Sequence, residues 1–591
     1  MNLEQQLQRI HAAMLSASVK QTAPLSDQAP IAIIGLSGYF PNAMSVKEFW
    51  TLLDKDQQAL ASIPLSRFDW QQSFSPDDVP GKNRSRWGGF IPDIAGFDPL
   101  FFHITPAEAA ELDPKLRLLL MSAYLTLGDA GLAPSRLRES ATGVFIAAQD
   151  NDYSTQGYAQ ACLLANRLSY FFDWRGTSEI IDAQCPGAAL ALHRAVQALR
   201  SGELTMALVG AANVILSPEP YLLLSEHKQL SRQPHVASFG RDADGHLRSE
   251  GVATVLLKPL ANALADGDPI YAAIKNSWVN FNGQGGASIA APNVASHVEL
   301  IVKCYEQTGV DIRRIAYIEA QGMGNRLADL AEWQAFNQAL TQLAQRQKVR
   351  LSPGQCRVST LKPLLGHMES ASVLGALFKI IRSFKTNTIH KIIGFTEANP
   401  DLELVDVPCR LVKQTEAWPE QDLPRLAGLH AYAMGGSNAH LLIEDYVAPI
   451  TKHFANPHSL NQPQTVLPSE LIVLSAASQA SLLGLVRALA DYLTGLENPP
   501  ELADVAHTLQ IGRDDFTHRL ALIVSSISEL STALPLLSAE QPVPAQVFFA
   551  QGQVDAKALT EVKPLSIQSS DAASLKTFSS ALAARRFSRL V

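Results

Sequence analysis

The chain contains little cysteine and shows no cysteine pattern. Its 591 residues include five cysteines, an odd number, and none belongs to a CxxC pair. The spacing therefore predicts neither a disulfide framework nor a zinc site. No apolar run reaches the roughly 18 to 20 residues of a membrane helix, and no basic region followed by an apolar run indicates a signal peptide. These absences favour a protein of the reducing cytoplasm that has no membrane contact.

An excess of positive charge is also absent. Lysine and arginine total 48 against 56 aspartate and glutamate, which gives a net charge of −8 and argues against a broad nucleic-acid surface. The sequence contains no P-loop, no GxSxG elbow, no HExxH and no kinase motif set, and Gly35 and Gly38 do not have GxGxxG spacing. Hydrophobic residues make up 47% of the chain, enough to form a large core.

Strand-like apolar runs alternate with amphipathic helical segments from residue 31 to residue 446. Such alternation predicts an α/β fold with crossover connections and a mainly parallel sheet that is covered on both faces. The predicted strands lie at 31–35, 141–148, 206–216, 252–260, 316–320 and 440–446, and the predicted helices at 46–55, 189–202 and 327–340.

The flanking segments differ in composition from this central region. Residues 1–28 have apolar residues at helical spacing followed by a polar stretch, which predicts a helical linker that either packs on the main domain or docks a partner chain. Residues 447–469 are polar and contain four prolines, as expected of a linker. Residues 470–591 predict a smaller α/β subdomain and a C-terminal linker. Met1 favours a true N-terminus, and the weakly patterned end favours a cut or a split module.

Cys185 is the residue with the clearest chemical potential. It comes just before a helical stretch, with Pro186 at a position suited to the first helical residue. A helix N-terminus favours a thiolate, and its free N–H groups stabilise a developing oxyanion. A lone cysteine in an alanine-rich stretch is, however, more often a small buried apolar residue.

Seven ordered blocks across residues 31–446 resemble the ketosynthase domain of modular polyketide synthases. The blocks include IAIIGLSGYFPNAMSVKEFW, DAQCPGAALALH, SFGRDADGHLRSEGVATVLLKPL, IEAQGMGNRLADLAEWQAF, STLKPLLGHMESASVLGALFK and GLHAYAMGGSNAHLLIEDY. This resemblance implies a thiolase-like, duplicated, layered αβαβα fold. The unit after the linker is similar to the flanking subdomain of such ketosynthases. Because the chain has neither an acyltransferase GHSxG nor a carrier-protein DSL serine, it resembles systems whose acyltransferase acts in trans.

The resemblance assigns catalytic roles to individual residues. Cys185 matches the nucleophile that accepts an acyl chain as a thioester, and His367 and Lys362 match the family's KxNxGHxE block, although Leu364 replaces its asparagine. The histidine of the family's HGTGT block falls on Gln321, so this histidine is missing. A glutamine amide still donates a hydrogen bond but does not exchange a proton near neutral pH, and we expect it to remain as a polar group lining the pocket.

The C-terminal glycine-rich block implies two substrate-binding residues, Met434 and Asn438. Met434 replaces the aromatic side chain that gates the pocket in this family, and its N–H is the expected second oxyanion donor if it packs beside Cys185. Simple core filling is the alternative for Met434. Other departures from the family pattern occur at Pro186, Gly187, Ala188, Met323, Asn325, Ala328, Leu330, Tyr432 and Ala433.

These features together favour a non-elongating ketosynthase. Acylation needs a thiolate and an oxyanion hole, whereas decarboxylative condensation also needs the two histidines. The resemblance implies upstream and downstream acyl carrier proteins, other polyketide synthase modules, a homodimer, and no cofactor bound by this chain, since the substrate travels on the carriers' phosphopantetheine. The alternatives are an elongating or unusual carbon–carbon bond-forming ketosynthase, a catalytically silent scaffold, and a stand-alone fatty-acid or thiolase-type enzyme, which the flanking subdomain disfavours.

Overall fold

The computed structural model describes residues 25–551 apart from 27, 150–152, 154–159, 286–287, 421–423, 448–468, 497, 540 and 542–545. The chain divides into two compact units, one comprising Met1–Ala130 and Leu137–Pro449, the other Gly131–Arg136 and Ile450–Val591. Most of the predicted docking segment 1–28 and of the predicted linker 447–469 lies outside the described residues. Among the described helices, none has both the length and the apolar character that a membrane span requires.

The larger unit is built on an 11-stranded sheet with the order β12-β10-β9-β14-β15-β8-β1-β7-β6-β4-β5. Its strands are β1 (Ile31–Tyr39), β4 (Thr142–Ala148), β5 (Ser178–Ile181), β6 (Met206–Asn213), β7 (Gly251–Pro259), β8 (Ala272–Phe281), β9 (Ile315–Glu319), β10 (Cys356–Ser359), β12 (Cys409–Leu411), β14 (Leu426–Tyr432) and β15 (Ser437–Asp445). Each strand predicted from the sequence corresponds to one of these.

The pairing of the strands is mixed, so the expectation of a mainly parallel sheet is wrong. The outer strands pair in parallel, as β4 does with β5 and β6, and β9 with β10 and β14. The middle strands, from β14 through β15, β8, β1 and β7 to β6, pair antiparallel. The turn between β14 and β15 is too short for the crossover helix that parallel pairing needs.

The sheet consists of two halves with the same topology. The order β1-β7-β6-β4-β5 in the first half matches β8-β15-β14-β9-β10 in the second, with the same parallel and antiparallel pairings. The helices correspond as well, because each lies between equivalent strands along the chain. They are α4 (Pro114–Asp129), α5 (Leu163–Phe172) and α6 (Gly187–Arg200) in the first half, and α9 (Val294–Glu306), α10 (Arg326–Gln347) and α12 (Ser372–Thr386) in the second.

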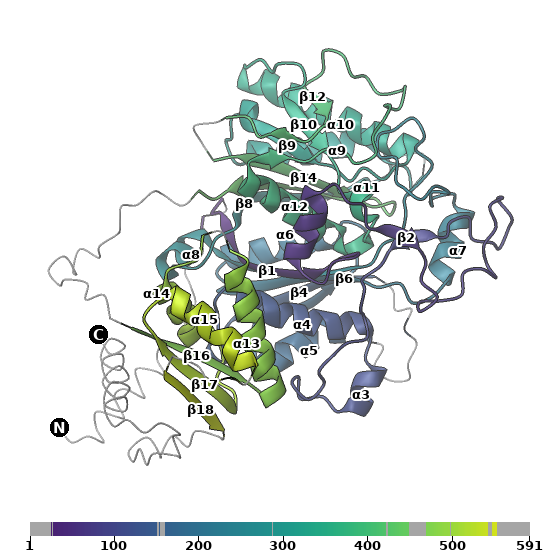
Figure 1. Cartoon of the computed structure of the whole chain (residues 1–591). Helices are drawn as coiled ribbons and strands as arrows, with labels where there is room; N and C mark the ends of the chain where they lie inside the picture. Colours follow the sequence, from purple (N-terminus) through teal and green to yellow (C-terminus); the bar gives the residue numbers. More distant parts are fainter. Residues whose placement is uncertain are drawn as a thin grey trace. The chain divides into compact units, whose positions relative to one another are not determined.

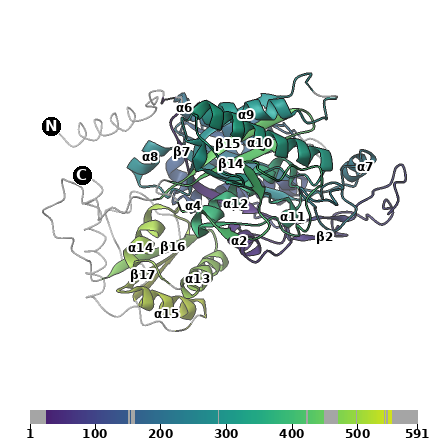
Figure 2. The ribbon, with the colours of Figure 1, turned by 90° about the horizontal axis from the view of Figure 1, so that it is seen from above.

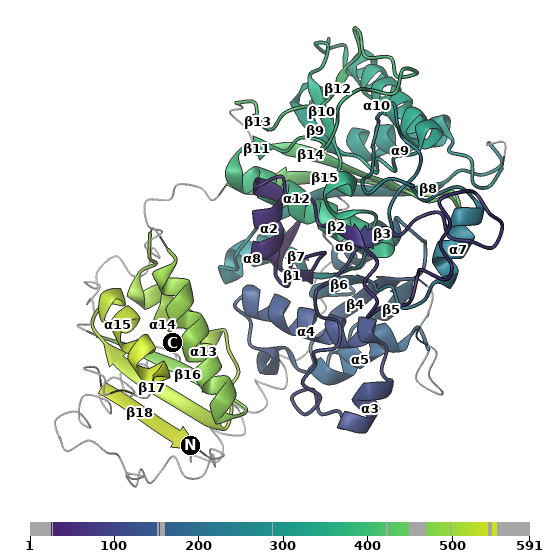
Figure 3. The same ribbon diagram turned by 45° about the vertical axis from the view of Figure 1, so that its right-hand side comes forward.

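The helices and half-sheets form five layers. α9 and α10 cover the outer face of the second half, α4 and α5 cover the first, and α6 and α12 lie between the halves (Figures 1 and 3). The largest apolar core joins α6 and α12 to strands of both halves, and includes Leu192, Phe378, Val209 and Leu429. This is the thiolase-like αβαβα arrangement. Cys185 lies before α6 in the first half, and His367 lies before α12, the corresponding helix of the second half. The fold thus brings together two residues that precede equivalent helices.

Shorter elements surround this frame. Helix α7 and strand β2 lie at the same side of the larger unit (Figures 1 and 2). The bounds of the shorter helices and strands are α2 (Val46–Asp54), α3 (Pro106–Glu111), α7 (Glu219–Glu226), α8 (Leu260–Asp266), α11 (Lys362–Leu365), β2 (Leu60–Ser62), β3 (Trp87–Gly89), β11 (Thr388–Ile389) and β13 (Glu416–Ala417).

The smaller unit has its own core. Its antiparallel sheet of β16 (Glu470–Ala476), β17 (His518–Val524) and β18 (Gln546–Gln551) is joined by α13 (Gln479–Thr494), α14 (Leu502–Ile511) and α15 (Ile527–Ser538). Alternate residues of β16 and β17, among them Ile472 and Leu522, pack with residues of the three helices. The sequence pattern predicts strands at 471–478 and 519–526 and helices at 482–496 and 501–512 in this unit, which correspond to β16, β17, α13 and α14. It does not predict helix α15 or strand β18.

Candidate active site

A tight turn places Cys185 directly ahead of helix α6. Gln184 has a φ of 58°, the left-handed region, and the Gly187 N–H donates to the Gln184 carbonyl at 2.9 Å. Helix α6 begins at Gly187, with Pro186 as its N-cap residue. Pro186 was expected to be the first helical residue. It lies one position earlier because the turn around Cys185 is completed before the helical hydrogen bonds begin.

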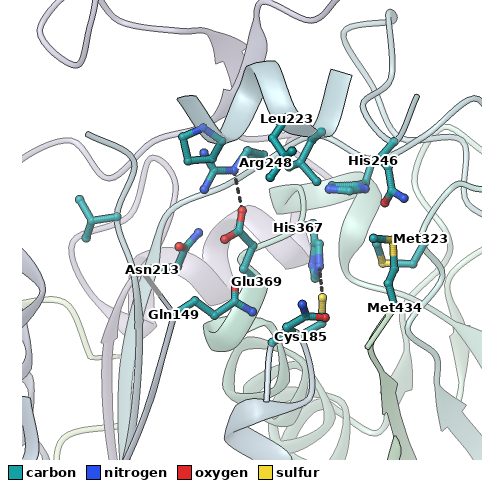
Figure 4. Close-up of a pocket in the computed structure, with 15 residues that line it drawn as sticks. Gln149, Cys185, Asn213, Leu223, His246, Arg248, Met323, His367, Glu369 and Met434 are labelled. Atoms are coloured by element: carbon teal, nitrogen blue, oxygen red, sulfur yellow. Dashed lines mark hydrogen bonds and ion pairs between the residues drawn. The ribbon is translucent and has the colours of Figure 1, made fainter. Parts of the chain in front are cut away.

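His367 lies opposite the cysteine, held by the turn that follows helix α11. Its Nε2 is 3.0 Å from Cys185 Sγ, and its Nδ1 is 2.9 Å from Ser372 Oγ (Figure 4). The His367 N–H donates to the Leu247 carbonyl at 2.7 Å, which fixes the backbone. Ser372 is the first residue of α12. The start of α12 therefore orients the His367 imidazole, which faces Cys185 at the start of α6. The structure thus brings together the predicted nucleophile and histidine.

Burial keeps both members of this pair uncharged. Burial raises the pKa of the Cys185 thiol to about 12, and the nearby Glu369 carboxylate adds to the rise. Burial, with the positive charge of Lys362, lowers the pKa of His367 well below its ordinary value. Loss of solvation thus outweighs the effect of the helix N-terminus, which by itself favours a thiolate. In the arrangement that fits, the thiol donates to Nε2 and the Nδ1–H donates to Ser372.

Gln321 lies behind this pair and is only 2% exposed. Its Oε1 accepts from Lys362 Nζ at 3.3 Å, and its Nε2 donates to the Tyr432 carbonyl at 3.2 Å. Glu332 of α10 accepts the backbone N–H groups of Gln321 and Gly322. Both ends of the Gln321 side chain thus have a partner within the protein, and this residue does not line the cavity as we expected. Burial also lowers the pKa of Lys362.

A cavity of about 170 Å³ opens in front of Cys185 and His367. Its lining includes the apolar side chains of Leu223, Met323 and Met434. Asn438 does not line it, since this side chain is buried and its amide donates to Asn280 Oδ1 and Asn282 Oδ1 at 3.0 and 2.8 Å. A direct substrate contact of Asn438 therefore stays a prediction without support from the geometry.

Met434 lies at the mouth of the cavity with 37% of its surface exposed. It is therefore not a core-filling residue. Among the described residues, none accepts a hydrogen bond from the Met434 N–H. A free amide at the edge of a cavity that contains Cys185 fits the predicted role as an oxyanion donor.

Several site residues escaped the sequence prediction. His246 and Arg248 line the cavity, and the ring centroids of His246 and His367 are 5.1 Å apart in an edge-to-face arrangement. The letters HLRS in the third block gave no clear signal, because Leu247 is the only apolar residue among them although all four residues are buried. Glu369, the glutamate of the KxNxGHxE block, also lines the cavity. The described residues contain no cluster of histidine, cysteine or acidic side chains suited to a metal ion.

A duplicated five-layer fold with a cysteine–histidine pair between its halves defines a thiolase-like condensing enzyme. The chain belongs to the beta-ketoacyl synthase family. The models "Beta-ketoacyl synthase, N-terminal domain" and "Beta-ketoacyl synthase, C-terminal domain" match residues 28–263 and 271–396. The model "RhiE-like, KS-MAT linker domain" matches residues 473–541, within the smaller unit.

Similar proteins are ketosynthases and polyketide synthases. The ketosynthase from module 6 of the bacillaene synthase of Bacillus subtilis 168 superimposes with a TM-score of 0.81 and 31% identity, over 88% of this chain and 87% of that one. The oxazolomycin ketosynthase domain OzmH KS7 of Streptomyces albus JA3453 gives 0.81 and 31%, over 88% and 90%. Polyketide synthase PksR of Bacillus subtilis (strain 168) is 38% identical over 86% of this chain, which spans 20% of its length. The chain spans 12% of polyketide synthase PksL of the same organism, at 34% identity.

Proposed function

We propose that this chain is a non-elongating ketosynthase of a modular polyketide synthase. It accepts an acyl chain from an upstream acyl carrier protein onto Cys185 and passes it to a downstream carrier without adding carbon atoms. The observation that carries this proposal is the state of Gln321. This residue stands where the catalytic histidine of the family's HGTGT block is expected, and its side chain is bound to Lys362 and Tyr432 outside the cavity.

The transfer needs one base, one nucleophile and an oxyanion hole. Cys185 Sγ attacks the thioester carbonyl while His367 Nε2 takes the thiol proton across the 3.0 Å contact. The N–H groups of Cys185 and Met434 stabilise the oxyanion. Collapse of the intermediate expels the carrier's thiolate, which takes the proton from His367. The reverse sequence, with a second carrier thiol as nucleophile, releases the acyl chain and restores the Cys185 thiol.

Condensation also needs a hydrogen-bond donor for an enolate oxygen, which the family's HGTGT histidine supplies and which Gln321 does not replace. Decarboxylation of a malonyl thioester builds negative charge on an enolate oxygen, which the family stabilises with two histidines. Loss of one such donor typically slows the reaction by about 10² to 10³. One of the two Gln321 amide N–H groups already donates to the Tyr432 carbonyl, and the side chain does not line the cavity where the substrate would lie.

One observation favours the elongating alternative. His246 lines the cavity and its ring packs against His367, so this site contains a second imidazole at a different position. Burial lowers the pKa of His246 to about 3, which leaves it a neutral imidazole able to donate one hydrogen bond. If His246 holds the malonyl carbonyl, condensation survives the loss of the usual histidine.

Release of carbon dioxide from a malonyl-loaded carrier protein distinguishes the two functions. We expect the natural chain to release no more carbon dioxide than Cys185→Ala does. Gln321→His should gain this activity if the histidine at position 321 is all that condensation lacks. Activity in the natural chain that disappears in His246→Ala would instead establish the elongating function. Cys185 acylation, measured in parallel, shows whether the Gln321 and His246 variants are folded, and circular dichroism shows it for Cys185→Ala.

The same proposal extends to assembly. The relatives are polyketide synthases much longer than this chain, which supports carrier proteins and other modules as partners. We also propose that the acyltransferase is supplied in trans. We propose a homodimer by analogy with the family. Sedimentation equilibrium is then expected to give twice the 64.0 kDa of one chain, and a monomeric mass would contradict this part of the proposal.

A further inference from the structure

A hydrogen bond at the mouth of the active-site cavity connects the two halves of the fold. The Gly435 N–H donates to Gln184 Oε1 at 3.2 Å. Gln184 comes directly before Cys185 in the first half, whereas Gly435 lies in the turn between β14 and β15 of the second half. Gln184 and Met434 both line the cavity and are exposed to solvent. The bond therefore joins the segment that carries the nucleophile to the turn that carries Met434 (Figure 4).

The backbone of Gln184 is fixed on both sides. Its N–H donates to Asp182 Oδ1 at 3.2 Å, and its carbonyl accepts the Gly187 N–H at 2.9 Å. Between these two bonds Gln184 has a φ of 58°, a left-handed conformation that is uncommon for a residue with a side chain. Such conformations cost energy and concentrate at functional sites. The side chain that reaches Gly435 thus starts from a backbone held in a defined and costly geometry.

The turn from Ala433 to Gly436 leaves the N–H groups of its two central residues unused. The Gly436 N–H donates to the Ala433 carbonyl at 3.0 Å, which closes the turn. The N–H of Gly435 is the one bound by Gln184. Among the described residues, none accepts the N–H of Met434, the other central residue. Gln184 therefore holds the amide next to the expected oxyanion donor and leaves that donor available.

We infer that Gln184 is a positioning residue that aims the Met434 N–H at the oxyanion when Cys185 is acylated. This inference rests on the proposed acyl transfer and concerns the same site. Two consecutive glycines follow Met434, and glycine adopts many backbone conformations at little cost. A hydrogen bond to the first of them restricts the peptide unit directly after Met434. Oxyanion donors are effective because they are in place before charge develops, so this restriction favours acylation.

Two reactions of Cys185 separate oxyanion stabilisation from other changes in the site. Acylation by the N-acetylcysteamine thioester of hexanoic acid passes through an oxyanion. Alkylation by iodoacetamide forms the S–C bond by displacing iodide from a saturated carbon, while the thiol proton goes to solvent, and no oxyanion develops. Both reactions need the same sulfur to be accessible and to lose its proton. The ratio of the acylation rate to the alkylation rate therefore measures oxyanion stabilisation.

Three variants test the role of the Gln184 oxygen. Gln184→Met keeps the length of the side chain without the acceptor, and we expect it to lower the ratio about 10-fold. The loss should appear in the maximal acylation rate and not in the half-saturating thioester concentration, because the oxyanion forms only as the reaction proceeds. Gln184→Glu keeps an acceptor oxygen and should keep the ratio, since an effect of its charge on the thiol enters both rates.

The matched control is Gln355→Met. Gln355 Oε1 also accepts a backbone N–H, that of Ser352 at 3.0 Å, but Gln355 does not line the cavity. This variant should keep the natural ratio. An unchanged ratio in Gln184→Met would overturn the inference, whether the two rates stay the same or decrease together, and so would a ratio that decreases equally in Gln184→Glu. Alkylation without any acyl adduct in the natural chain would overturn the proposed function and the inference with it.

Discussion

The proton on the Cys185 thiol decides when this sulfur can react. Burial and the Glu369 carboxylate raise the pKa of the thiol to about 12, and His367 is kept neutral by its own burial. The enzyme therefore rests as a thiol–imidazole pair and forms its nucleophile only as the proton moves to His367 Nε2. A buried cysteine–histidine pair of this kind is protected from reactions that need a standing thiolate.

The rate at which iodoacetamide alkylates Cys185 should depend on how much of its thiol is ionised. Because the thiol pKa is raised, the thiolate fraction increases about tenfold per pH unit across the range from pH 6 to 9, and the rate should increase with it. Peptide mass spectrometry separates Cys185 from the exposed Cys162. Glu369→Gln should increase the Cys185 rate by removing a negative charge. A rate that stays constant between pH 6 and 8 would show a preformed thiolate and contradict this account.

The roles of Cys185 and His367 were predictable because each lies in a distinctive motif. Their electrostatic state was not, since desolvation depends on how many atoms the fold packs around them. The same holds for Gln321, whose replacement of a histidine is visible in the sequence but whose contacts with Lys362 and Tyr432 come from distant segments. Arg248 became a site residue only when its strand-like segment met His367.

The turn between helix α11 and α12 is the element that aims His367 at the cysteine. Gly366, directly before His367, has φ 81° and ψ −170°, a region open essentially to glycine alone. A Cβ at this position would lie 3.0 Å from both the Leu247 carbonyl oxygen and Ser249 Cβ. The short helix α11 was not predicted, because four residues are too few to show a helical period.

Gly366→Ala should therefore disturb both stability and reactivity. We expect a loss of about 1–3 kcal/mol in the free energy of unfolding, and slower acylation of Cys185 per folded molecule because His367 shifts. Gly267→Ala is the control, since Gly267 has φ 71° but no atom within 4 Å of the added Cβ. Denaturant titration and the acylation rate measure the two effects. Acylation at the natural rate in Gly366→Ala would show that this turn does not position the histidine.

The elements of both units were predictable to different degrees. The alternation of strands and helices in the larger unit is visible because each segment is long and strongly patterned. The antiparallel pairing in the middle of the sheet was not, since it depends on which strands the connections bring together. Helix α15 escaped prediction because Pro535 interrupts its pattern, although the helix continues through this proline near its end.

The two units have separate apolar cores. The reactive residues Cys185 and His367 belong to the larger unit. The core of the smaller unit contains none of the cavity-lining residues. Leu522, fully buried in β17, is a central residue of that core. The duplication of the larger unit explains why two helix ends meet at Cys185 and His367, an arrangement that belongs to the whole fold and to no single motif.

Leu522→Ala should lower the stability of the smaller unit alone. Truncating a buried leucine typically costs about 2–5 kcal/mol, so calorimetry should show one thermal transition moved to lower temperature and another unchanged. The rate of Cys185 acylation at 25 °C should stay at the natural value. A single transition that moves as a whole would show that the two units unfold together.

Intact-protein mass spectrometry tests the central claim most directly. The natural chain is first incubated with an acyl thioester and then with a malonyl-loaded carrier protein, with Cys185→Ala and Gln321→His beside it. The account predicts an acyl adduct on Cys185 that passes to an unloaded carrier unchanged, with no two-carbon extension from the malonyl carrier. Extension by the natural chain would contradict it and show that His367, with Gln321 or His246, suffices for condensation.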